Sequence, residues 1–226
     1  MIKIDMKNKP KKTKRERKVE KELLWIFLFV VFLIIVFVVA SAVFKSFNNF
    51  DYKGLSFTKE KLGNLTFYHY YYYFVNNNQL TKYNLYLRND PRTNNVPLEG
   101  DDIIFERRKD VYVSLDSTGL QECRFGTLAV AGLISFLVDN QIDVKGANLD
   151  FWDAGRRRQD WETCETRPEN IVISIFEGNE TKININGNCH EISVANCEIL
   201  DATERYELES ILDAMKTSSR GRVIAS

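Results

Sequence analysis

The residues best placed to carry out chemistry form the segment Asp116-Ser117-Thr118-Gly119. It follows the apolar run Val111–Leu115 and precedes a long apolar stretch, so the sequence predicts a serine at a strand-to-helix corner. A serine at such a corner can act as a nucleophile, and the amides of the helix N-terminus can bind an oxyanion or a phosphate. One interpretation of this segment is therefore the site of an extracytoplasmic hydrolase.

The residues around this segment also fit a structural role. The nucleophile elbow needs glycines at G-x-S-x-G, and here Leu115 and Thr118 stand beside the Asp-Ser pair instead. Thr118 also interrupts the Asp-Thr/Ser-Gly triplet that aspartic proteases use. Thr118 and Gln121 have the spacing of a capping box at the start of a helix predicted over Leu120–Val138. We therefore expect helix capping here rather than catalysis.

Other residues give little sign of a reaction or a cofactor. The two histidines, His69 and His190, are placed by no motif beside a serine or cysteine nucleophile. The sequence contains no Walker loop, dinucleotide glycine pattern or metal-ligand spacing, so we expect no cofactor and no metal. Arg88 and Arg92 stand in a turn-rich loop, which we interpret either as a site for an anionic ligand or as a charged surface loop.

A long apolar run precedes the domain that must position these residues. Leu23–Phe44 contains one polar side chain, that of Ser41. As a helix it would reach about 33 Å, enough to cross a hydrocarbon core of roughly 30 Å, and a buried soluble helix rarely runs so long without a polar face. We predict a transmembrane helix. The alternative is a signal peptide cleaved after Ala42, because residues 40–42 have the small-x-small form.

Charge is distributed unequally on the two sides of this run. Residues 1–22 hold ten Lys or Arg and four Asp or Glu, whereas residues 23–226 hold 21 basic and 27 acidic side chains. Positive charge beside a membrane helix stays on the cytoplasmic side. We therefore predict a cytoplasmic N-terminus and an extracytoplasmic C-terminal domain. A basic tail can also bind nucleic acid, but beside a membrane helix we expect contact with membrane lipid and no nucleic acid partner.

The remainder of the chain has the size and composition of one folded domain. We predict an α+β ectodomain with a largely antiparallel sheet and two helices, preceded by the one transmembrane helix. The predicted boundaries are a basic cytoplasmic tail at 1–22, the transmembrane helix at 23–44, a juxtamembrane connection at 45–54, the extracytoplasmic domain at 55–216 and a flexible tail at 217–226.

The strands of this domain are predicted from β-forming runs separated by turn residues. Leu65–Val75 should pair antiparallel with Tyr83–Leu87, with the tyrosines at 68, 70 and 72 on one face and those at 71 and 73 on the other. This tyrosine run is interpreted as core packing or as a stacking platform for sugars. Ile171–Phe176 and Thr181–Ile185 are predicted to form a hairpin.

Two helices complete the prediction. The first, over Leu120–Val138, would join the strand at Val111–Leu115 to one at Gln141–Lys145 in a strand–helix–strand unit. The segment that follows, with two tryptophans and three consecutive arginines, is predicted to be an exposed loop pinned by tryptophan packing. The second helix, over Asp201–Lys216, has capping-box spacing between Asp201 and Glu204.

The four cysteines all follow the apolar run. An even number in an oxidising compartment predicts two disulfides, with three pairings allowed by the sequence. We favour Cys189 with Cys197, which would close a short loop, and Cys123 with Cys164. Zinc binding is the competing interpretation, but there is no C-x-x-C and His190 is the only histidine nearby. Asn64 and Asn179 begin glycosylation sequons that agree with a glycoprotein facing the exterior.

The overall arrangement resembles that of uncharacterised single-pass membrane proteins of archaea. The resemblance rests on the basic tail, the apolar helix, the cysteine-bearing exterior and the segments YNLYLRNDPR, at Tyr83–Arg92, and NCEILDATER, at Asn196–Arg205. It implies location and fold and carries no assigned activity. Type IV pilins share the plan of a hydrophobic helix before a β-rich head, but Lys21-Glu22 stands where their glycine-type cleavage site would be.

These observations predict a membrane-anchored, non-enzymatic binding or assembly component of the cell envelope. Its partner would be an envelope protein, a glycan or another copy of the chain. Two alternatives remain open, a hydrolase acting through Asp116, Ser117 and Thr118, and a subunit of a pilin-like filament. The residues that we expect to contact a ligand are these three together with Arg88 and Arg92.

Overall fold

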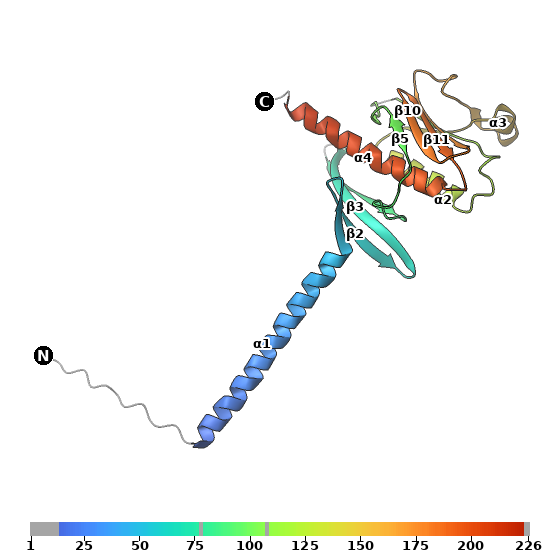
Figure 1. The fold of residues 1–226 in the computed structure, drawn as a ribbon. Coiled ribbons are helices and arrows are strands. Elements are labelled where there is room, and N and C mark those ends of the chain that lie inside the picture. The colour runs from blue at the N-terminus through green and yellow to red at the C-terminus, as the bar shows by residue number, and fades with distance from the viewer. Residues whose placement is uncertain (1–13, 77–78, 107–108, 224–226) are drawn as a thin grey trace. The chain divides into compact units, whose positions relative to one another are not determined.

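The structure is a computed structural model that describes residues 14–76, 79–106 and 109–223. The chain divides into two compact units, one ending at Phe50 and the other beginning at Asp51 (Figure 1). Most of the predicted basic tail, residues 1–13, lies outside the described residues, as do residues 224–226 at the end of the predicted flexible tail.

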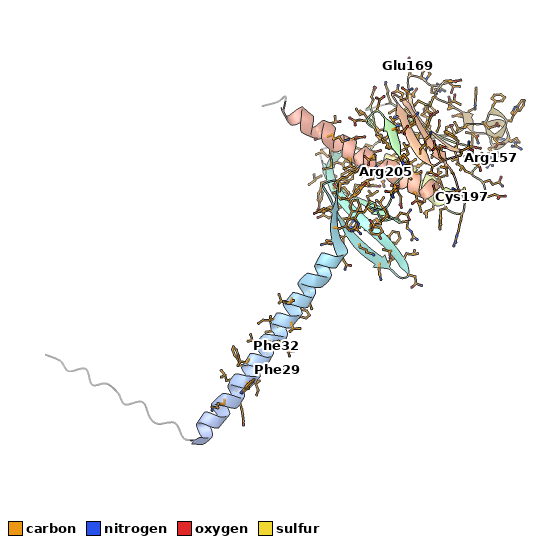
Figure 2. All side chains as sticks on the ribbon, viewed as in Figure 1. Phe29, Phe32, Arg157, Glu169, Cys197 and Arg205 are labelled. Carbon is orange, nitrogen blue, oxygen red and sulfur yellow. A yellow bond between two sulfur atoms is a disulfide. The ribbon has the colours of Figure 1, made fainter. Side chains whose placement is uncertain are left out.

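The first unit is dominated by one long helix, α1 (Lys14–Asn48). Within it Lys21–Ser41 is long and apolar enough to cross a membrane, and almost all of its side chains are exposed. Figure 2 shows Phe29 and Phe32 projecting from this helix. A core helix of a soluble protein would be buried, so the apolar helix has the character of a membrane anchor or a signal sequence.

The second unit begins with an antiparallel sheet, sheet A, whose strands follow one another in chain order. The strands are β1 (Asn49–Tyr52), β2 (Leu55–Leu62), β3 (Leu65–Asn76) and β4 (Gln79–Leu87). The predicted antiparallel pair is confirmed, because β3 pairs with β4 from Tyr68 opposite Leu87 to Asn76 opposite Gln79. The predicted alternation is also confirmed, because Tyr68 is buried whereas Tyr71 and Tyr73 are half exposed.

The larger sheet, sheet B, has seven strands in the order β5-β10-β11-β9-β6-β7-β8. They are β5 (Leu98–Gly100), β6 (Val111–Leu115), β7 (Val144–Asn148), β8 (Asp160–Trp161), β9 (Ile171–Glu177), β10 (Lys182–Asn186) and β11 (Cys189–Val194). β6 and β9 lie at the centre and are buried along nearly their whole length. Continuous apolar runs of this kind are typical of strands covered on both faces.

Sheet B is mixed, so a largely antiparallel architecture is not confirmed. β6 pairs parallel with both β7 and β9, β9 pairs parallel with β11, and only β10 with β11 is antiparallel. The predicted hairpin of β9 with β10 is wrong, because β11 lies between those two strands. The predicted strand–helix–strand unit is confirmed. Its helix carries the chain back to the end of the sheet where β6 begins, so β7 runs parallel to β6.

The helix of that unit is α2 (Gly126–Asp139), which begins several residues later than predicted. Residues 117–122 form turns, and Phe125 occupies the N-cap position without a side-chain cap. The predicted capping box of Thr118 with Gln121 is therefore wrong. A third helix, α3 (Phe151–Arg157), occupies part of the predicted loop, and its Trp152 is 76% exposed rather than packed.

The last helix, α4 (Ile199–Val223), connects the two sheets and extends past the predicted end at Lys216. On one side Tyr206 hydrogen-bonds His190 of β11, and on the other Glu204 accepts hydrogen bonds from the backbone at the end of β4. Residues 202–213 are buried except Arg205, which is partly exposed. The predicted capping box of Asp201 with Glu204 is wrong, because Glu204 is used by the backbone of Arg88 and Asn89.

Candidate functional site

The predicted serine corner lies at the carboxyl end of β6, where Asp116 closes a tight turn. Its Oδ1 accepts hydrogen bonds from the backbone N–H groups of Thr118 (3.2 Å) and Gly119 (2.9 Å). Gly119 fits so closely that an added Cβ would lie 2.9 Å from the Cβ of Glu177. The type and position of Asp116 and Gly119 are thus explained by the geometry of the turn.

The other two residues of the corner bind the last residue of β7 and a residue of α3. Asn148 is fully buried, and its Nδ2 donates to Ser117 Oγ (2.7 Å) while its Oδ1 accepts from the N–H of Asp150 (2.9 Å). Thr118 Oγ1 donates to the buried Asp153 carboxylate, which also pairs with Arg156. The polar groups at the carboxyl edge of β6 and β7 therefore satisfy one another and join two loops.

This arrangement does not activate Ser117. A nucleophilic serine needs a neighbour that accepts its proton, and the backbone contact of Asn148 Oδ1 fixes the amide so that it donates to Ser117. Both histidines lie elsewhere. His69 is on sheet A between Glu60 and Asn84, and the buried His190 contacts Tyr206.

Arg88 and Arg92, the other predicted ligand contacts, lie in the loop after β4. Arg92 forms a two-point ion pair with Asp90 and lowers the pKa of that carboxyl. The guanidinium of Arg88 stands 5.0 Å from the ring centre of Phe67, and its backbone N–H donates to Glu204. The contacts of this loop are with sheet A and α4, whereas those of Ser117 and Thr118 are with the last residue of β7 and with α3.

Both disulfides form, but the favoured pairing is wrong. Cys123 bridges Cys197 with a Cα–Cα distance of 5.1 Å, and Cys164 bridges Cys189 at 5.3 Å. β11 starts at Cys189 and ends shortly before Cys197, and such a strand spans roughly 20 Å, far beyond the reach of a disulfide. The extended conformation of β11 thus excludes the short loop that the sequence suggested.

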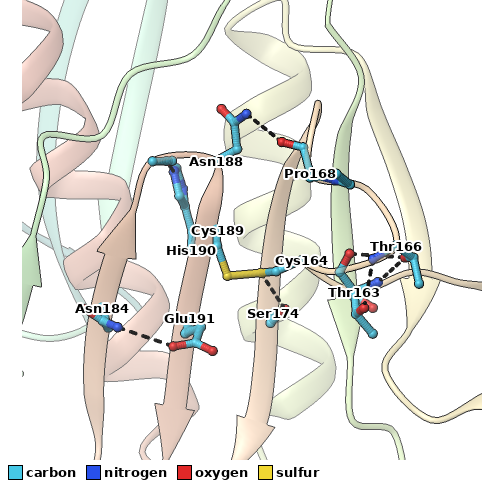
Figure 3. The surroundings of a disulfide bond; sticks show 12 residues. Thr163, Cys164, Thr166, Pro168, Ser174, Asn184, Asn188, Cys189, His190 and Glu191 are labelled. Carbon is cyan, nitrogen blue, oxygen red and sulfur yellow. Dashed lines mark hydrogen bonds between the residues drawn. A yellow bond between two sulfur atoms is a disulfide. The ribbon is translucent and has the colours of Figure 1, made fainter.

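The Cys164–Cys189 disulfide crosses the face of sheet B (Figure 3). Cys164 lies 3.9 Å from Ser174 Oγ of β9 and packs against the buried cluster of Tyr112, Ala147 and Val172. Asn188 Nδ2, next to Cys189, donates to Pro168 O (3.0 Å), so the crossover before β9 is attached to sheet B at two points.

The two sequons lie in exposed turns. Asn64 is between β2 and β3, and Asn179 is between β9 and β10. Both asparagines are exposed, which glycosylation requires, and the modification itself stays a prediction. Within the described residues no group of three His, Cys, Asp or Glu is arranged to hold a metal ion.

A different feature, which the sequence did not indicate, has the form of a binding site. A cleft of about 1340 Å³ opens between the second half of β3, the segment at Ile103–Glu106, the end of α2 with the turn after it, and the last turns of α4. The aromatic residues in its wall are Tyr70, Tyr72, Tyr73, Phe74, Phe105 and Phe136. Aliphatic side chains, including Ile103 and Met215, line a further part. The remaining lining residues are polar or charged: Glu106, Lys109, Asn140, Gln141, Asp143, Ser210, Thr217 and Ser218.

Two of the polar groups in this lining are fixed by hydrogen bonds. Tyr72 hydroxyl donates to Asn140 Oδ1, and Asn140 Nδ2 donates to Phe136 O (2.8 Å), so both side chains are held in place. Behind this wall Glu207 is buried against α2, and burial together with Glu204 raises its pKa to about 8. Burial also raises the pKa of Tyr72, so its hydroxyl keeps the proton that it donates to Asn140.

No local sequence pattern indicates this cleft, because its walls come from segments far apart in the chain. The alternation in β3 correctly turned Tyr70 and Tyr72 inward, but nothing local showed that the space before them stays open. The roles of Asn148 and Asp153 were not predicted because the end of the preceding strand was placed too early. The strand before them was predicted at Gln141–Lys145, and in the structure it runs to Asn148, where the carboxyl ends of parallel strands meet.

Comparisons with protein-family models, with curated proteins and with solved structures find no match for this chain.

Proposed function

We propose that this protein is a membrane-anchored binding component of the cell envelope, with a cytoplasmic N-terminus and an extracytoplasmic domain that works without catalysis. The excess of basic residues before the apolar helix supports this orientation. The two disulfides support an oxidising compartment for the domain, because disulfides are rare where thiols are kept reduced. The resemblance to archaeal single-pass proteins remains part of the same proposal.

The observation that carries the binding role is the cleft beside β3. Ligand sites are concave and combine apolar walls with a small number of fixed polar groups. In this cleft Tyr72 and Asn140 are fixed by a hydrogen bond among aromatic and aliphatic side chains, and charged residues such as Glu106 and Lys109 also belong to its lining. Its volume exceeds the range of roughly 300 to 1,000 Å³ that is usual for small-molecule pockets. A ligand that extends along the cleft therefore fits better than a compact metabolite.

The hydrolase alternative has less support. Ser117 receives a hydrogen bond from Asn148 rather than giving its proton to a base, and the Asp116 carboxylate is used by the turn. The residues of this edge stabilise the domain, and we assign them no ligand.

The role of the cleft is tested by photo-crosslinking in intact cells that express the full chain. The photo-reactive residue p-benzoylphenylalanine replaces Met215 or Tyr73 in the cleft, and Leu128 or Tyr86 as controls. The two control side chains are exposed to a similar extent but do not line this cleft. We expect a discrete adduct from both cleft positions and from neither control. Adducts from all four positions, or from none, would overturn the proposal.

The location is tested separately with an impermeant maleimide, before and after reduction by an impermeant phosphine. We expect labelling of intact cells only after reduction. Labelling without reduction, and only once the cells are lysed, would place the domain in the cytoplasm.

A further inference from the structure

The strand β3 is paired with β4 along most of its length on one edge, and with β2 along only its first part on the other. Its ladder with β4 runs from Tyr68 to Asn76, whereas the ladder with β2 covers only Leu65–His69. Past the end of this ladder β3 stays paired with β4 alone, while β2 continues to Leu55 and its Phe57 packs against Tyr70, with 5.5 Å between the ring centres. We call this part of β3 and β4 the ribbon. In the part of the chain that the structure describes, β2 and β4 are the only strands paired with β3.

The free edge of this ribbon carries backbone hydrogen-bonding groups. In an antiparallel strand the N–H and C=O groups alternate between the two edges, so about half of those in Tyr70–Val75 point away from β4. Open edges of this kind are templates for a further strand, and proteins usually cover them. On this stretch of β3 a side chain contacts the backbone: Gln141 Nε2 donates a hydrogen bond to Val75 O (3.5 Å).

The cleft lies along this same stretch of β3. Tyr70, Tyr72, Tyr73, Phe74 and Val75 all line it, and the opposite walls come from the segment at Ile103 and from α4. Because side chains alternate along a strand, a strand added beside β3 would turn every second side chain toward the apolar wall and the others toward solvent. The cleft thus combines a free backbone edge with space for alternate apolar side chains.

We propose that the ligand of this cleft is an extended polypeptide segment of a partner protein, which binds by adding a strand to the edge of β3 at Tyr70–Val75. This inference rests on the proposed binding function and names the class of ligand. A backbone edge repeats its donors and acceptors every second residue, and a polypeptide strand has the matching repeat. An acyl chain has no such groups, and it would leave the edge of β3 unsatisfied. The partner segment should alternate apolar and polar residues.

The test uses the full chain in lipid nanodiscs and a defined probe. The probe is a pool of acetylated, amidated octapeptides in which Val, Ile, Leu or Phe alternates with Thr. Two further pools carry N-methyl groups, one on every apolar residue and the other on every Thr. In a bound strand the N–H groups of one set face β3 and those of the other face away, so one methylated pool should lose binding and the other should keep it.

Hydrogen exchange measured by mass spectrometry supplies the structural readout. We expect exchange of the Tyr70–Val75 amides to slow at least tenfold with the unmethylated pool, while amides of β9 are unaffected. Ala214→Trp, which fills the cleft from α4, should abolish this protection. The matched variant Leu128→Trp, on α2 and away from the lining of the cleft, should retain it. Unfolding of either variant would appear as faster exchange across α4.

The other outcomes are distinguishable. If both methylated pools bind equally, side chains rather than the backbone make the contact, and the strand proposal is wrong. If no pool binds although Met215 and Tyr73 give a lipid or glycan adduct in cells, the strand proposal is wrong and the binding function stands. If the edge amides are protected without peptide in a manner that depends on protein concentration, the occupant is a second copy of the chain, which also overturns the proposal. Failure of the crosslinking overturns both.

Discussion

The carboxyl edge of β6 and β7 and the cleft beside β3 differ in how their polar groups are used. At the edge, Asp116, Thr118, Asn148 and Asp153 pair with one another or with nearby backbone, and the residue types that suggested chemistry hold two loops together. In the cleft, Tyr72 and Asn140 are fixed by a hydrogen bond among apolar and charged lining residues, beside a partly unpaired strand. Residues of types that suit catalysis therefore indicate a site only when some of their hydrogen-bonding groups are not already used within the fold. Changes at the edge should lower stability, and changes in the cleft should alter binding.

The largest effect should follow loss of the disulfide that joins the region after the edge turn to the start of α4. The double change of Cys123 and Cys197 to Ser opens a loop with a sequence separation of 74 residues. Chain entropy then predicts a loss of about 4 kcal/mol in the free energy of unfolding. Chemical denaturation followed by tryptophan fluorescence measures it. The same change at Cys164 and Cys189, separated by 25 residues, should cost about 1 kcal/mol less.

Asn148→Ala should destabilise the domain by about 2 kcal/mol, because it leaves the N–H of Asp150 without its acceptor and opens a cavity in a fully buried position. The same denaturation experiment measures this loss. Ala214→Trp is the matched change in the cleft and should move the unfolding midpoint far less. An equal loss in both variants would mean that the two regions do not differ in the way described above.

The acid buried behind the cleft predicts a dependence of stability on pH. The pKa of Glu207 is about 8 in the folded chain and 4.5 as a free side chain, so its contribution is complete below pH 4.5 and is lost as the pH rises toward 8. Glu207→Gln should therefore melt close to the original chain at pH 5 and a few degrees above it at pH 8.5. Thermal scans at both values check this, and a constant difference between the two chains would contradict it.

Two neighbouring groups shape the rest of the profile and are unchanged in that variant. Glu204 has a pKa of about 7, which acts in the same direction as Glu207. His190 has its pKa lowered to about 4 by burial, so stability is lost as the pH falls from 6.5 toward 4. Both chains should therefore lose stability together on the acidic side.

The smallest effect is expected from Tyr72→Phe in the wall of the cleft. It removes the hydroxyl that donates to Asn140 and should cost about 1 kcal/mol in unfolding free energy. A strand bound through the backbone of β3 does not need this hydroxyl, so peptide affinity should change less than twofold. Titration of the octapeptide pool measures the affinity. A tenfold loss would indicate that the side chains of the wall recognise the ligand.

Local patterns predicted the elements that depend on neighbours in the sequence. The strand at Val111–Leu115 has the predicted bounds, and β3 and β4 pair as expected. The two capping boxes failed because distant partners compete for the same side chains. The Thr118 hydroxyl donates to Asp153, and the Glu204 carboxylate accepts from the backbone N–H of Arg88 after β4.

The order of strands and the disulfide pairing depend on contacts that no local pattern contains. The sequence does not indicate that β11 lies between β9 and β10. The apolar pattern of β9 is equally compatible with pairing to β10 or to β11. The cleft is harder still to predict from the sequence. It exists because the side chains of four separate segments do not fill the space between them. A sequence pattern shows which residues are apolar or polar, but it does not show where packing leaves a gap.

The position of α4 has a consequence for how the domain is made. Both sheets place buried groups against this helix, and it follows every strand that the structure describes. Neither sheet can reach its final packing until this last helix has been synthesised. The aromatic inner face of β3 therefore stays uncovered until the end of synthesis, although β3 itself is made early.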